Sequence, residues 1–113
     1  MKFRMKMASS VIAGLLVVTA LAMAGQDMAA QIAAAKTAAD HEAIAAEYTK
    51  DAAALRADAD RHDKMAKQYT GSFKDKLHLD VHCEAVAAND RSSAKELDEL
   101  AAAHRAAAKE AGK

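Results

Sequence analysis

The chain has 113 residues with 16 basic and 16 acidic side chains, no proline and a single cysteine. A neutral chain with mixed charges lacks the basic surface of a nucleic-acid-binding protein. Without proline and with few aromatic residues, the alanine-rich sequence cannot build a usual globular core, because alanine buries little apolar area. Long helices that pack closely through alanine are the fold that this composition favours.

Residues 1–24 have the features of a secretory signal peptide. Lys2, Arg4 and Lys6 precede an apolar run over residues 11–23, and Ala22-Met23-Ala24 fits a cleavage site before Gly25. This run is shorter than the ~20 residues that span a bilayer. Since residues 1–24 carry three basic and no acidic side chains, the remaining chain has a net charge of −3. We therefore expect a periplasmic or secreted protein, with no stable membrane insertion after cleavage and no nucleic-acid partner.

Residues 25–113 are predicted to form one helical hairpin. Asp27 is placed to cap the first turn, and nothing between Met28 and Tyr69 resembles a helix breaker. Gly71 is a natural left-handed terminator, and Ser72 with Asp75 has the spacing of a capping box. We expect a helix over about 28–70, a turn over about 71–75 and a second helix over about 76–110.

Two stripes with a strict step of seven residues predict that the helices pack along their length. The smaller stripe of the first helix contains Ala38, Ala45, Ala52, Ala59 and Ala66. Its larger stripe contains His41, Tyr48, Leu55, His62 and Tyr69. The second helix repeats this pattern with Ala87, Ala94, Ala101 and Ala108 beside Cys83, Asp90, Leu97 and His104. The fold class is therefore all-α, an antiparallel two-helix hairpin, and the breadth of its apolar surface predicts self-association into a four-helix bundle.

The larger stripes contain residues that could bind a metal ion or haem, where leucine would pack better. With a tip near Gly71–Phe73, His62 would lie opposite Cys83, and His41 opposite His104. The candidate ligands form two clusters about 30 Å apart along the helices; they are His62, Cys83, His82 and Asp58 in one, and His41 with His104 in the other. Imidazole and thiolate suit zinc, copper, nickel and iron. The alternative is that these histidines are hydrogen-bonded across the helix pair and only fix its register.

Cys83 cannot form a disulfide within the chain, because it is the single cysteine. A buried thiol, a disulfide between two chains and a metal ligand all remain open for it. Two helices offer no pocket or oxyanion hole, so we expect a protein that is not an enzyme.

Asp40-His41-Glu42, Tyr48, His62, Tyr69, His82-Cys83-Glu84 and His104-Arg105 together resemble a pattern in small exported bacterial proteins. Those proteins are alanine-rich helical hairpins without an assigned activity. The resemblance implies an envelope protein and nothing about its mechanism. Two functions therefore remain: a small metal- or haem-binding protein, or a structural or stress-related envelope protein, such as a coiled-coil adaptor, whose histidines only tune packing.

Overall fold

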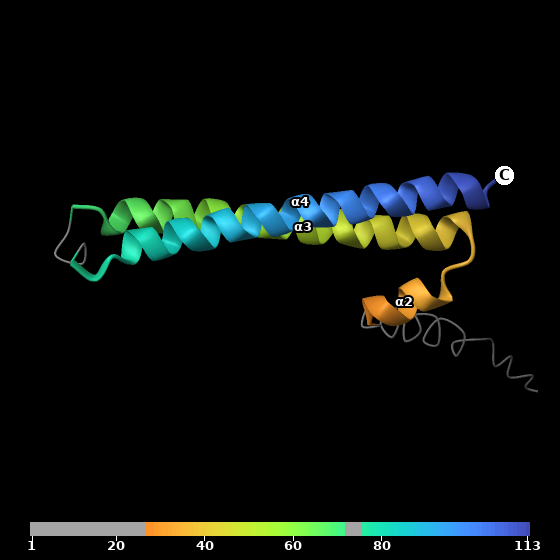
Figure 1. Ribbon diagram of the computed structural model, residues 1–113, viewed down its shortest axis with the longest axis horizontal. Coiled ribbons are helices and arrows are strands. Elements are labelled where there is room, and N and C mark those ends of the chain that lie inside the picture. The colour runs from red at the N-terminus through yellow and green to blue at the C-terminus, as the bar shows by residue number, and fades with distance from the viewer. Residues whose placement is uncertain (1–26, 72–75) are drawn as a thin grey trace, which may run out of the picture. The chain divides into compact units, whose positions relative to one another are not determined.

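A computed structural model describes residues 27–71 and 76–113, and all regular structure in these ranges is helical (Figure 1). The described helices are α2 (Met28–Ala34), α3 (Ala38–Tyr69) and α4 (Leu79–Ala111). The expected signal peptide, residues 1–24, and the expected capping box of Ser72 and Asp75 lie outside the described residues.

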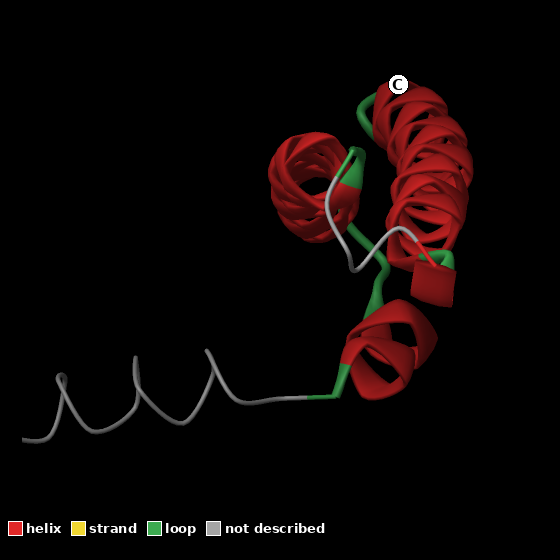
Figure 2. Ribbon diagram, turned by 90° about the vertical axis from the view of Figure 1, so that its left-hand side faces the viewer, coloured by secondary structure: helices red, strands yellow, loops and turns green. Residues whose placement is uncertain are grey.

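Helices α3 and α4 pack against each other as an antiparallel hairpin, which confirms the predicted fold class (Figures 1 and 2). Their contact surface is made of the alanine stripes. Within the described chain the buried residues are Ala45, Ala52, Ala59 and Ala66 of α3, Ala87, Ala94, Ala101 and Ala108 of α4, and Ile44 and Cys83. Because the alanine side chain ends at Cβ, the two helix axes can approach closely along the whole seam.

The larger stripes lie at the margin of this seam. His41, Tyr48 and Leu55 on α3 are half-buried, as are Asp90 and Leu97 on α4. Each stripe therefore keeps part of its side chains in contact with solvent while the alanine beside it is covered. This placement puts imidazole and carboxylate groups at the edge of a tightly packed interface.

The prediction of one continuous helix from residue 28 to about 70 was wrong, because the chain leaves the helical conformation between α2 and α3. Thr37 is the N-cap of α3 in an extended conformation, with φ −108° and ψ 161°. Its hydroxyl accepts a hydrogen bond from the Asp40 backbone N–H at 3.1 Å, and the Asp40 carboxylate accepts from the Thr37 N–H at 2.9 Å. This reciprocal capping box makes α3 start as a separate helix after Thr37, despite the high helix propensity of the flanking alanines.

Helix α2 begins as the sequence predicts. The Asp27 carboxylate accepts a hydrogen bond from the Ala29 backbone N–H at 3.3 Å, so Asp27 caps the first turn. The helix has only seven residues and none of them is buried.

Helix α4 begins at Leu79, three residues later than expected. His78, just before it, has a left-handed backbone with φ 53°, and this conformation cannot continue a right-handed helix in either direction. Gly71, after the end of α3, has φ 76° and so adopts the left-handed conformation that the sequence predicts for it.

The two edges of the seam differ in chemistry. On α4, the residues that follow the larger stripe by one position are charged, whereas those that precede the alanine stripe by one position are largely apolar. We call the first the ion-pair edge and the second the apolar edge, and helix geometry places them on opposite sides of the seam. The ion-pair edge contains Arg56 with Asp98, Arg91 with Asp60 and Asp63, and Arg105 with Thr49. The apolar edge contains the exposed side chains of Val86 and Leu100 on α4. It also contains the exposed side chain of Met65 on α3, which likewise precedes a residue of the alanine stripe by one position.

Candidate metal centre

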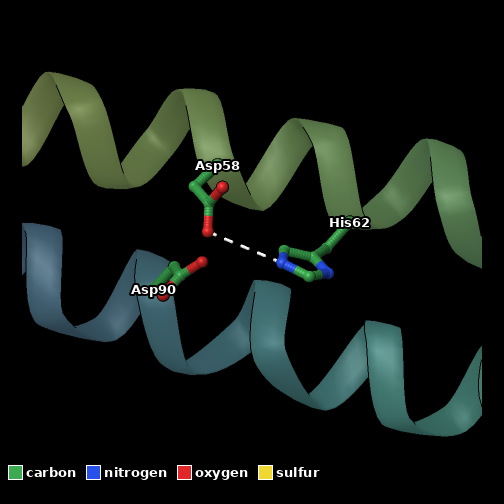
Figure 3. Close-up of side chains that lie close together, drawn as sticks. All are labelled: Asp58, His62 and Asp90. Atoms are coloured by element: carbon green, nitrogen blue, oxygen red, sulfur yellow. Dashed lines mark ion pairs between the residues drawn. The ribbon is translucent and has the colours of Figure 1, made fainter.

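Three potential metal ligands meet near the middle of the hairpin (Figure 3). Asp58 and His62 project from α3 and Asp90 projects from α4, so both helices contribute. One donor atom from each residue lies within 4.8 Å of the other two. The imidazole Nε2 of His62 is 3.5 Å from Oδ2 of Asp58.

Helix periodicity explains why these residues converge. Asp58 and His62 are four residues apart and therefore lie on the same face of α3. Asp90 occupies the larger stripe of α4, and antiparallel docking through the neighbouring alanines Ala59 and Ala87 brings it to the same level. The alanine packing sets the register of α3 against α4, and this register brings the three ligands together.

The cluster is half-buried, and its polar atoms lack protein partners at two points. The His62 side chain is 19% exposed and that of Asp58 is 37% exposed. Nδ1 of His62 and Oδ2 of Asp90 are both shielded from solvent and make no hydrogen bond within the described chain. A shielded polar atom without a partner typically costs about 1–3 kcal/mol. An ion in the cluster would remove this penalty at Oδ2 of Asp90 but not at Nδ1 of His62, because Nε2 is the nitrogen that faces Asp58 (Figure 3).

A basic residue near the cluster pairs with one of its two carboxylates. Arg61 forms an ion pair with Oδ1 of Asp58, so Oδ2 of that residue remains directed toward His62. Arg91 follows Asp90 in the chain but binds Asp60 and Asp63 on the ion-pair edge. The hydrogen bond from Arg91 holds the pKa of Asp63 below its ordinary value. The same contacts with Asp63 and Asp60 raise the pKa of Arg91.

Two carboxylates and one neutral imidazole form a mixed oxygen and nitrogen donor set. Such donors suit zinc and other divalent transition metals, with bond lengths of about 2.0–2.2 Å. Two donors on one ion cannot be further apart than about twice that bond length. The donor atoms would therefore draw together slightly by side-chain rotation when an ion binds.

The structure brings only part of the predicted first cluster together. Asp58 and His62 are joined by Asp90, which was not among the predicted metal ligands. Cys83 and His82 do not belong to any set of three or more close ligands among the described residues. His82 is exposed. Cys83 is 8% exposed and packs in the seam of the hairpin.

His41 and His104 face each other as predicted. Their Nδ1 atoms are 3.1 Å apart and their ring centroids are 5.3 Å apart. The Tyr48 ring lies next to them, with its centroid 5.8 Å from that of His104. The pair is separated from the Asp58–His62–Asp90 cluster by about 30 Å of helix.

Comparisons of the chain with protein-family models, with curated proteins and with solved structures yield no match. Across residues 27–71 and 76–113, none of the helices combines the length and the apolar character required to cross a membrane.

Proposed function

We propose that the protein is an exported, non-catalytic helical hairpin that binds a divalent transition-metal ion at Asp58, His62 and Asp90. The observation that carries this proposal is the convergence of three donors from two helices within 4.8 Å. The shielded Oδ2 of Asp90, which makes no hydrogen bond within the described chain, supports it, because an ion or its bound water would supply the partner that this oxygen lacks.

The functional consequence of such binding is control of hairpin docking. The seam is lined mostly by alanine, so its burial stabilises the helix pair less than a leucine seam would. An ion held by Asp58 and His62 on one helix and Asp90 on the other links the two helices directly. Its binding free energy then adds to folding, by about 2.7 kcal/mol when free metal exceeds Kd by roughly 100-fold.

The donor set favours an ion over haem. Haem iron is held axially by His, Cys, Met or Tyr side chains, whereas two carboxylates and an imidazole match Zn²⁺ and neighbouring divalent ions. Zinc is therefore the first ion to test, with copper and nickel as comparisons.

The experiment is a Zn²⁺ titration of the full-length protein by calorimetry, followed by thermal melts with and without the ion. Asp90→Asn and His62→Ala should each abolish the bound equivalent and the metal-dependent rise in Tm. Asp51→Asn and His82→Ala are the matched controls, because both residues are exposed and outside the cluster. Zinc uptake that is unchanged in Asp90→Asn would overturn the proposal.

A second candidate function, a structural envelope protein that associates with itself, is favoured by the apolar edge. Met65 is 37% exposed, Val86 39% and Leu100 44% in the hairpin. Burying this edge between two copies would give the four-helix bundle that the sequence predicts. Sedimentation of the full-length protein and of a Val86→Lys variant tests this role; equal, monomeric masses for the two proteins would exclude it.

A further inference from the structure

We propose that His41 and His104 form a second metal site, with imidazole ligands only, at the end of the hairpin where α3 begins and α4 ends. It is independent of the carboxylate-containing site, from which about 30 Å of helix separates it. Its ligand class is a divalent ion that prefers nitrogen donors and accepts water in the remaining positions, such as Cu²⁺ or Ni²⁺.

The distance between the two Nδ1 atoms carries the argument. Two nitrogen ligands about 2.0–2.1 Å from one metal ion lie about 2.9 Å apart at a right angle and about 3.4 Å apart at a tetrahedral angle. The observed separation of 3.1 Å falls between these values. The spacing of the two nitrogens therefore suits two ligands of one ion, and each ring turns so that its lone pair points to the ion instead of to the other nitrogen.

The rings occupy this position without a metal because they form a hydrogen bond, in which one Nδ1 donates and the other accepts. Metal binding requires a lone pair on both Nδ1 atoms. The donor ring must then carry its proton on Nε2 instead, a change of tautomer that releases no net proton from two neutral rings.

Local structure holds both ligands in place. The Thr37–Asp40 capping box fixes the first turn of α3, and the His41 backbone N–H donates to the Thr37 carbonyl at 3.2 Å. Ile44, one turn further on, is 2% exposed and anchors this end of α3 in the seam. The Arg105 side chain, next to His104, donates to the Thr49 hydroxyl at 2.8 Å and so is engaged on the ion-pair edge. A preorganised pair of ligands loses little conformational entropy on binding.

The test is a Cu²⁺ titration of full-length protein that carries His62→Ala and Asp90→Asn, so that the first site is disabled. Electron paramagnetic resonance should show a copper signal split by imidazole nitrogens. His104→Leu or His41→Leu in this background should weaken binding by about tenfold or more, since even changes outside the ligand shell cost that much. Leucine suits these positions, because Leu97 occupies the same stripe one heptad before His104.

His82→Ala in the same background is the control for a histidine that is exposed and outside the pair. It should leave both the affinity and the nitrogen splitting unchanged. Helix content measured by circular dichroism identifies any variant that does not fold. Loss of copper binding in the folded leucine variants but not in His82→Ala supports the site. Copper affinity and spectra that are unchanged in folded His104→Leu would overturn it, whatever the result at Asp58, His62 and Asp90.

Discussion

Arg56 on α3 and Asp98 on α4 form an ion pair across the hairpin, although 42 residues separate them in the chain. Seven residues earlier on α3 and seven later on α4, Thr49 accepts a hydrogen bond from Arg105 at 2.8 Å. Seven residues in the other direction, Asp63 contacts Arg91. The ion-pair edge therefore repeats with the same step as the seam and maintains one antiparallel register over three heptads.

The coupling between Arg56 and Asp98 should be small and dependent on salt. The hydrogen bond with Asp98 raises the pKa of Arg56, but both side chains are about half exposed, so solvent screens their attraction. A double-mutant cycle of Arg56→Ala and Asp98→Ala, measured by urea unfolding, should give a weakly favourable coupling that is lost in 1 M salt, where the Debye length is about 3 Å. A coupling that persists in high salt would contradict this view of the edge.

Enlarging a seam alanine should destabilise the hairpin much more than losing an edge contact. Ala52 is fully buried between the helices, so Ala52→Leu would force the axes apart or the new side chain out of its preferred rotamer. We expect a loss of about 1–3 kcal/mol of unfolding free energy. Ala53→Leu is the matched control, because Ala53 is exposed on the same helix. If urea unfolding gives the two variants equal stability, close packing through alanine does not hold the hairpin together.

The Thr37 cap is the next feature that can be tested by substitution. Thr37→Ala removes the hydroxyl that accepts from the Asp40 N–H, and it should cost about 1 kcal/mol of stability, as N-cap substitutions typically do. Thr37→Ser keeps the hydroxyl and should retain most of that stability. Hydrogen exchange at the first turn of α3 provides the local measurement. Equal protection of this turn in the alanine and serine variants would show that the cap does not stabilise it.

The sequence predicts the seam well because a step of seven residues is a repeated signal. Ala45 and Ala94 lie in separate helices, yet each is fully buried, as its stripe requires. The pairing of His41 with His104 follows from the same register once the tip of the hairpin is placed.

Local features are harder to predict, because each depends on a few atoms. Thr37-Ala-Ala-Asp40 has the spacing of a capping box, but it lies within an alanine-rich run that favours uninterrupted helix. His78 interrupts the chain before α4 through a backbone conformation that its residue type does not specify.

Asp90 was not predicted as a metal ligand, because histidine and cysteine were the main residue types that indicated a metal site. The sequence did contain an indication of this role, because a carboxylate in the larger stripe must lie near the opposite helix. Cys83, seven residues earlier in the same stripe, is buried but joins no ligand set of three or more among the described residues. Stripe membership therefore predicts proximity to the seam, and only the three-dimensional register decides which side chains meet.

The pH dependence of the cap follows from the Asp40 carboxylate. Backbone N–H donors of Lys36 and Thr37, each 2.9 Å from Oδ2, hold the pKa of Asp40 below its ordinary value. Because the folded pKa is lower than the unfolded value of about 3.9, the ionised cap stabilises α3 above that pH. This contribution decreases as the pH falls through the folded pKa. A carboxyl-carbon NMR titration should place the Asp40 midpoint below the ordinary value for an aspartate, and Thr37→Ala should raise it toward that value. A midpoint for Asp40 at or above the ordinary value would mean that the carboxylate does not cap the helix in solution.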